Sequence, residues 1–155
     1  MAKAPKVTVK DNGYDAMMKR LERADAHVTV GVHEEEGSED AGDGATISDV
    51  AAFHEFGLGV PRRSFIGDWS DENEEANRKV LRQTAEAVAK GSVATAEQGL
   101  DRAGLHFVGE IQRRIRDGIA PELEDATIAQ KGSATPLIDT GQLWQSIRHR
   151  VKPAK

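Results

Sequence analysis

The chain has 155 residues, of which 38% are hydrophobic, 30% are charged and none is cysteine. A chain of this length buries enough surface for one hydrophobic core without disulfides or a structural metal, so we expect a single domain over residues 1–155. The lack of cysteine excludes zinc ribbons, iron–sulfur clusters and thiol nucleophiles, and the formal net charge of −5 disfavours general binding to duplex DNA.

The N-terminal part of the chain predicts two strands and a helix. The first ten residues are charged and lack the apolar core of a signal peptide, and no long apolar run follows, so we expect neither export nor a membrane span. Residues 7–9 alternate as a short strand does, and residues 14–23 have the apolar spacing of a helix. Residues 27–32 alternate apolar and polar side chains and contain β-branched residues, the pattern of a strand with one face on a core.

An acidic segment follows at about residues 33–45. It holds six carboxylates, three glycines and no Lys or Arg, so it has too few apolar side chains to bury itself, and we expect a flexible loop. Two interpretations remain open: a solvated excursion, or an acidic surface that faces a channel or a basic partner. The residues of that surface are Glu34, Glu35, Glu36, Glu39, Asp40 and Asp43.

The middle of the chain predicts three helices. Thr46 followed by Asp49 is typical of a helix start, and this helix ends near Gly57. After a glycine- and proline-containing loop, residues 70–90 and 93–118 each carry an apolar stripe of helical spacing. We expect these two long helices to pack together.

Three glycines lie inside the second long helix: Gly99, Gly104 and Gly109. They do not follow a strand, as the glycines of a phosphate-binding loop do. We therefore expect them to permit close helix contact.

The C-terminal part predicts an ordered loop, a helical turn at residues 141–144 and a closing strand over residues 146–152. The fold class is therefore α+β: a small, mainly antiparallel sheet of the strands at 7–9, 27–32 and 146–152, with room for one more, packed against two long helices and shorter helices.

Two motifs invite a chemical interpretation. Residues 137–141 match the apolar-apolar-Asp-Thr-Gly string of aspartic proteases, but those enzymes are all-β proteins, and the alternative is that Asp139 or Thr140 caps the next helical turn. His54 precedes Glu55 without a second histidine at metal-ligand spacing. We expect no catalytic residue, no metal and no cofactor.

The basic cluster from Arg148 to Lys152 is the one without neighbouring acids. Two interpretations remain open: an exposed sheet edge that positive charge protects from unwanted pairing, or a contact with an acidic partner. A nucleic-acid-binding module is a further class, which the net charge disfavours.

Three segments in a fixed order resemble a known family. They are Val28–Val32; VAAFHEFG at 50–57 with VPRRSFI at 60–66; and TIAQKG at 127–132 with TPLIDTGQL at 135–143 and the closing Ser146-Ile147. In this order, with long helices between the second and the third, the chain resembles the small neck proteins of tailed bacteriophages, the tail-completion and head-tail joining family of long-tailed and Mu-like phages.

The resemblance implies a structural virion protein of the neck or tail, present in the host cytoplasm during assembly, and not an enzyme. Such a protein forms a ring at the head-tail junction and contacts adjacent neck, tail terminator or tail tube proteins. Genomic DNA passes through its channel without sequence-specific binding, and no membrane is involved. Phage tail symmetry implies a hexameric ring, because a heterologous interface that closes produces a cyclic oligomer. The alternatives are a tail terminator or head-closure protein of the same neck and, from another class, a hydrolase that uses the DTG segment.

Large apolar residues gather in and after the loop that follows Gly57, where they either fill the core or meet a neighbouring subunit. In the second case residues 60–66 form a rigid arm that docks on the adjacent protomer or on the next ring. The expected interface residues are Phe56, Val60, Pro61, Arg62, Arg63, Phe65, Trp69 and Trp144.

Overall fold

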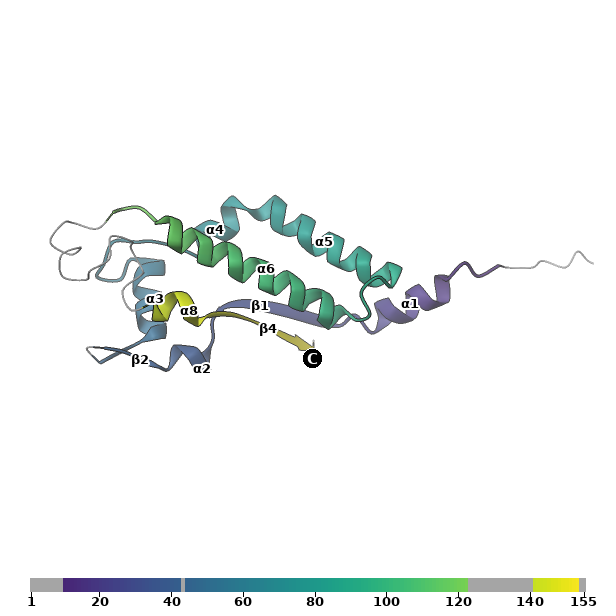
Figure 1. Ribbon diagram of the computed structural model, residues 1–155, viewed down its shortest axis with the longest axis horizontal. Coiled ribbons are helices and arrows are strands. Elements are labelled where there is room, and N and C mark those ends of the chain that lie inside the picture. Colours follow the sequence, from purple (N-terminus) through teal and green to yellow (C-terminus); the bar gives the residue numbers. More distant parts are fainter. Residues whose placement is uncertain (1–9, 43, 123–140, 154–155) are drawn as a thin grey trace, which may run out of the picture.

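The computed structural model describes residues 10–42, 44–122 and 141–153 of the chain, which form an α+β fold (Figure 1). The expected strand at 7–9, Asp43, and the segments at 127–132 and 135–140 lie outside the described residues. Within those described ranges, no helix has both the length and the apolar character needed to cross a membrane.

The central sheet consists of two antiparallel strands, β1 (Ala26–Val32) and β4 (Ile147–Pro153). Val28 lies opposite Val151, and Val30 lies opposite His149. Both strands confirm the predictions made for residues 27–32 and 146–152. A second, separate hairpin joins β2 (Asp40–Gly42) to β3 (Ala45–Thr46), so in the described part of the chain no third strand pairs with β1 or β4.

The helices cover one face of this sheet and flank its ends (Figure 1). They are α1 (Tyr14–Glu22), α2 (Glu34–Gly37), α3 (Ile47–Phe56), α4 (Gly67–Glu72), α5 (Glu74–Lys90), α6 (Ala96–Asp117) and α8 (Gln142–Ser146). The prediction of one continuous helix over residues 70–90 was wrong at its start. The chain breaks at Asn73, whose side-chain amide donates to the Trp69 carbonyl oxygen at 2.9 Å, so that α4 turns Trp69 into the core.

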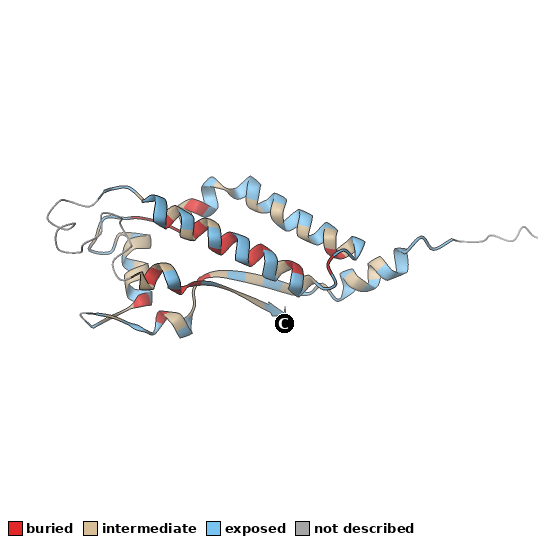
Figure 2. Cartoon of the chain, viewed as in Figure 1, coloured by how far each residue is buried: buried red, intermediate tan, exposed pale blue. Residues whose placement is uncertain are grey.

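Helix α6 lies at the centre of the core, between α5 and the β1–β4 pair (Figure 1). Its buried residues recur at helical spacing along the helix (Figure 2). Ile111 and Ile115 of α6 and Ile147 of β4 are 0% exposed, and the Phe107 ring packs edge-on against Trp69 with ring centroids 5.9 Å apart. The two predicted long helices therefore pack together, and the second of them also covers the sheet.

Two glycines of α6 lie where its neighbours come closest. A Cβ atom at Gly104 would lie 2.5 Å from His149 Cδ2 and 2.8 Å from His149 Cβ, and one at Gly99 would lie 2.7 Å from Thr84 Cγ2 on α5. Gly109 has no neighbouring atom within 4 Å of such a position. The expectation of close helix contact is therefore confirmed for Gly99 and wrong for Gly109, while Gly104 serves the contact with β4.

We expect Gly104→Ala and Gly109→Ala to change stability in opposite directions. At Gly104 the new methyl group meets a Cβ atom fixed to β4, and such overpacking lowers the free energy of unfolding by about 1–3 kcal/mol. At Gly109 the methyl group has open space, and replacing glycine in a helix raises the free energy of unfolding by about 0.5–1 kcal/mol. Urea unfolding of both variants measures the difference, and equal effects would contradict the close approach of α6 to β4.

Candidate assembly surface

Helix α3 directly precedes the loop that contains most of the predicted interface residues. It begins at a capping box in which the Thr46 hydroxyl accepts from the Asp49 backbone N–H at 3.2 Å and the Asp49 carboxylate accepts from the Thr46 N–H at 2.9 Å, as predicted. It ends at Gly57, whose φ of 73° lies in the left-handed region that favours glycine. The loop over residues 57–66 follows.

The carboxylate of Glu55, the penultimate residue of α3, holds the far end of this loop. Its two oxygens accept four hydrogen bonds, a set that we call the Glu55 clamp. The donors are Ser64 Oγ at 2.6 Å, Phe65 N at 3.0 Å, Ile66 N at 3.2 Å and Gly67 N at 2.8 Å. Since Ile66 is the N-cap residue of α4 and Gly67 its first residue, the same carboxylate fixes the loop and satisfies the first free N–H group of that helix.

The two adjacent arginines of the loop, Arg62 and Arg63, have different environments and partners. Arg63 is 4% exposed; its Nε donates to the Pro121 carbonyl oxygen at 2.8 Å, and its backbone N–H donates to the His54 carbonyl oxygen at 2.8 Å. It ties the loop to the chain beyond α6. Arg62 is exposed and forms a two-pronged ion pair with Asp68, at 3.1 and 2.5 Å.

Three of the predicted interface residues face inward. Phe65 is 1% exposed and Trp69 is 8% exposed, because the Glu55 clamp turns residues 65–69 toward the core, and Arg63 is buried beside them. These three are corrected to core positions and offer no surface to a neighbour. Trp144 is half-buried: its Nε1 donates to the Gln112 carbonyl oxygen at 3.2 Å, so it too serves mainly the fold.

The remaining predicted residues lie outside, with two that the sequence reasoning missed. Phe56 is 69% exposed, Leu58 is 55% exposed and Phe53 is 38% exposed, and the half-buried Val60 lies nearby in the chain. We call Phe53, Phe56, Leu58 and Val60 the apolar surface; Pro61 and Arg62 are exposed beyond them. Leu58 lies between Gly57 and Gly59, which have no side chains to pack against it. This position was the sequence signal that Leu58 would be exposed.

An open apolar groove of about 470 Å³ runs beside the apolar surface, between α3 and the turn that the Glu55 clamp holds. Val32, Ala51, Ala52, Phe56, Phe65 and Ile66 line it. The arrangement presents large apolar side chains and a groove on a backbone fixed by buried hydrogen bonds, which suits contact with another protein surface.

We expect Glu55→Gln to loosen this surface. A neutral amide offers one acceptor oxygen and sets an NH₂ donor against N–H or O–H donors, so the variant should lose about 2–3 kcal/mol of unfolding free energy, in the range for unsatisfied buried donors. The matched control is Glu39→Gln, an exposed carboxylate, which should change stability by less than about 0.5 kcal/mol. Thermal unfolding compares the two, and equal stability would show that the clamp does not hold the loop.

The acidic segment has regular structure, where the sequence suggested a flexible loop. It contains α2, β2 and β3, and Glu35 and Glu36 of α2 both accept hydrogen bonds from Arg150 of β4, at 2.9 Å and at 3.0 and 3.2 Å. The Arg150 guanidinium holds the pKa of Glu35 below its usual range. These two carboxylates therefore neutralise a residue of their own chain, while Glu34, Glu39 and Asp40 stay exposed.

His33, which precedes α2, lies beside the same arginine. Burial, and then the charge of Arg150, lower the pKa of His33 from its ordinary value of 6.5. Its Nε2 lies 3.0 Å from Thr29 Oγ1 on β1. A histidine with a lowered folded-state pKa binds fewer protons in the folded state than in the unfolded state, so it reduces stability as the pH falls through 6.5 toward the folded-state value.

We expect His33→Asn to remove this part of the acid sensitivity, since asparagine does not titrate and is favoured before a helix. Chemical unfolding at about pH 7.5 and about pH 5 should show a smaller loss of unfolding free energy in the variant than in the parent chain. An equal loss in both proteins would mean that His33 carries the same pKa folded and unfolded.

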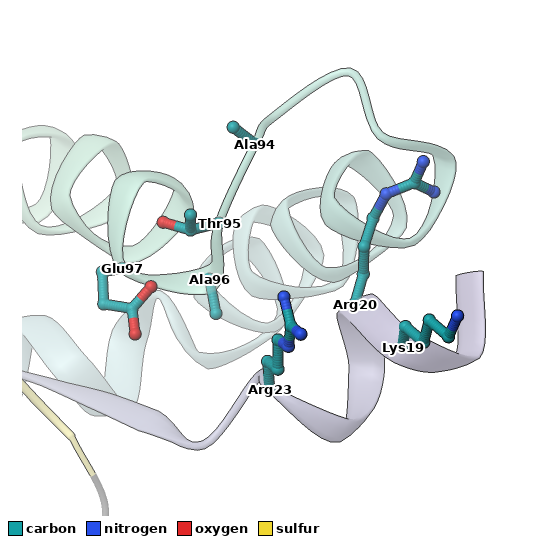
Figure 3. A pocket seen from close by; sticks show the side chains of 7 residues that line it. All are labelled: Lys19, Arg20, Arg23, Ala94, Thr95, Ala96 and Glu97. Carbon is teal, nitrogen blue, oxygen red and sulfur yellow. The ribbon is translucent and has the colours of Figure 1, made fainter. Parts of the chain in front are cut away.

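A second pocket, of about 300 Å³, lies between α1 and the start of α6, and its lining includes Lys19, Arg20, Arg23 and Glu97 (Figure 3). Arg20 donates to the Ala89 carbonyl oxygen at 3.1 Å and so closes the end of α5. The three cationic ends lie apart from one another and do not converge on one point (Figure 3). This pocket ties helices together and offers no arranged set of anion ligands.

Of the two chemical motifs, only the DTG segment falls largely outside the described part of the chain. Asp139 and Thr140 are outside the described residues, and Gly141, with a φ of 81°, begins the turn of α8. Among the residues that the structure describes, no group of three or more His, Asp or Glu side chains is arranged to hold a metal ion. No protein-family model, no curated protein and no solved structure matches this chain.

Proposed function

We propose that this chain is a structural protein of a tailed-phage neck, of the tail-completion or head-tail joining kind, which assembles with copies of itself into a ring around the DNA channel. The ordered segments at 28–32, 50–57 and 60–66 support the class through their resemblance to that family. The single observation that carries the assembly is the apolar surface, held on a backbone that the Glu55 clamp fixes.

The physical argument concerns the exposure of Phe56 and Leu58. Each is more than half exposed, and covering such a side chain is worth about 1.5–3 kcal/mol. A flexible loop could fold these side chains back on the protein, but the clamp and the buried Arg63 prevent that rearrangement. A second protein surface is therefore the way to bury them.

The proposal leaves two alternatives, one within the class of neck proteins and one from another class. A tail terminator or head-closure protein assembles by the same kind of contact and remains the alternative within the class. A hydrolase that uses Asp139 is the alternative from another class, and it predicts that Asp139→Ala abolishes turnover of a substrate without affecting assembly.

The test uses the double variant Phe56→Ser, Leu58→Ser. Its control is Leu105→Ser, because Leu105 is 58% exposed on α6, away from the apolar surface. We expect the parent chain and the control to form closed rings by negative-stain electron microscopy and mass photometry, with sixfold class averages. The double variant should stay folded by circular dichroism and associate at least tenfold more weakly.

Two results would contradict the proposal. A parent chain that stays monomeric at the highest soluble concentration is not a ring protein. Rings of the double variant that match those of the parent chain would mean that assembly does not use the apolar surface.

A further inference from the structure

The β1–β4 pair has one face on α6 and one face open to solvent. Ile147 is buried and His149 contacts Gly104 of α6, so the alternate side chains of β4 point to the other face. That face carries three cations in a row, which we call the basic strip: Arg148, Arg150 and Lys152. The opposing residues of β1 add no acid, since the register places Gly31, Thr29 and His27 across from them.

The basic strip is only partly neutralised by its own chain. Arg150 forms ion pairs with Glu35 and Glu36, whereas neither Arg148 nor Lys152 forms an ion pair with any of the described residues. Alternate residues of a strand lie roughly 7 Å apart, close enough for like charges to repel. Arg148 and Lys152 are both exposed, so the strip favours an anionic surface from outside the protomer.

The same chain carries a surface of the opposite sign. Glu34, Glu39 and Asp40, in and beside α2 and β2, are exposed and form no ion pair with the described residues; we call them the acidic surface. The contact of Arg150 with α2 shows, within one protomer, how glutamates of this segment fit a guanidinium of the strip. Charge complementarity between the two surfaces is therefore built into one sequence.

The basic strip begins near the acidic surface and extends away from it. Arg148 lies opposite Gly31, close to the end of β1 that leads through His33 into α2, whereas Lys152 lies opposite His27 at the far end of the strand pair. Figure 1 shows β2 on one side of α2 and the end of β4 on the other. A contact between two different surfaces of the same chain is heterologous, and a heterologous contact that repeats with a closing rotation produces a ring.

We propose that the basic strip of one protomer binds the acidic surface of the next, with Arg148 and Lys152 facing Glu34, Glu39 and Asp40. This inference rests on the proposed function, since it names the charged contact that accompanies the apolar surface in a ring of copies. The apolar surface supplies most of the affinity, and the charges fix the orientation and make association sensitive to salt.

The test reverses each surface separately. The strip variant is Arg148→Glu, Lys152→Glu, and the surface variant is Glu39→Lys, Asp40→Lys. Each variant alone places like charges at every contact, and we expect at least tenfold weaker association by mass photometry, with folding intact by circular dichroism. An equimolar mixture of the two should restore assembly, since each kind of protomer then meets its complement on both sides, and an even-numbered ring accommodates the alternation.

A matched control reverses two exposed cations elsewhere, Lys79→Glu and Arg82→Glu on α5, and changes the net charge by the same amount as the strip variant. It should assemble like the parent chain. Normal assembly of the strip variant or of the surface variant would overturn the inference while leaving the ring proposal intact. A mixture that fails to assemble would overturn the pairing of these two surfaces.

Two further outcomes are decisive. If the parent chain does not associate at all, the proposed function and this inference fall together. If the parent chain binds a short DNA duplex in a salt-dependent way, while the strip variant loses that binding and still forms rings, then the basic strip serves nucleic acid and the inference is wrong.

Discussion

The rest of the structure depends on the packing of α6 across a sheet of only two strands. Two strands alone are marginal in water, so β1 and β4 need a helix to cover one face. Helix α6 approaches closely because Gly104 leaves room for His149, and Ile111, Ile115 and Ile147 are then excluded from solvent. The same packing decides which face of the sheet stays open.

Polar groups, more than apolar ones, shape the surface that the fold offers to other proteins. Glu55 and Arg63 place a carboxylate and a guanidinium among backbone donors and acceptors of a loop that has no regular structure of its own. Buried polar networks of this kind specify one conformation when every member is satisfied. Phe56 and Leu58 are exposed as a consequence, since the residues on either side of them are fixed in place.

The charged residues likewise fall into two groups: those that stabilise the fold and those that remain exposed. The sequence predicts six carboxylates on one flexible loop, yet two of them, Glu35 and Glu36, bind Arg150 in the turn after β1. The exposed remainder and the basic strip give a protein of net negative charge two surfaces of opposite sign. In an assembly, these charged surfaces would fix the orientation of neighbouring protomers, while the apolar contact would provide most of the affinity.

The sequence by itself determined the local elements: the alternation of residues 27–32, the Thr46–Asp49 capping box, and the stripes of the long helices all follow from spacings of two and of three to four residues. It also grouped Phe56, Pro61, Phe65 and Trp69 within one short stretch of the chain. Only the tertiary structure decided that Phe65 and Trp69 turn inward while Phe56 and Leu58 stay out, because four donors from residues 64–67 meet one carboxylate nine or more positions earlier. The pairing of Arg150 with α2 was equally hidden, since contacts across more than a hundred residues depend on how β4 returns beside β1 and not on any local pattern.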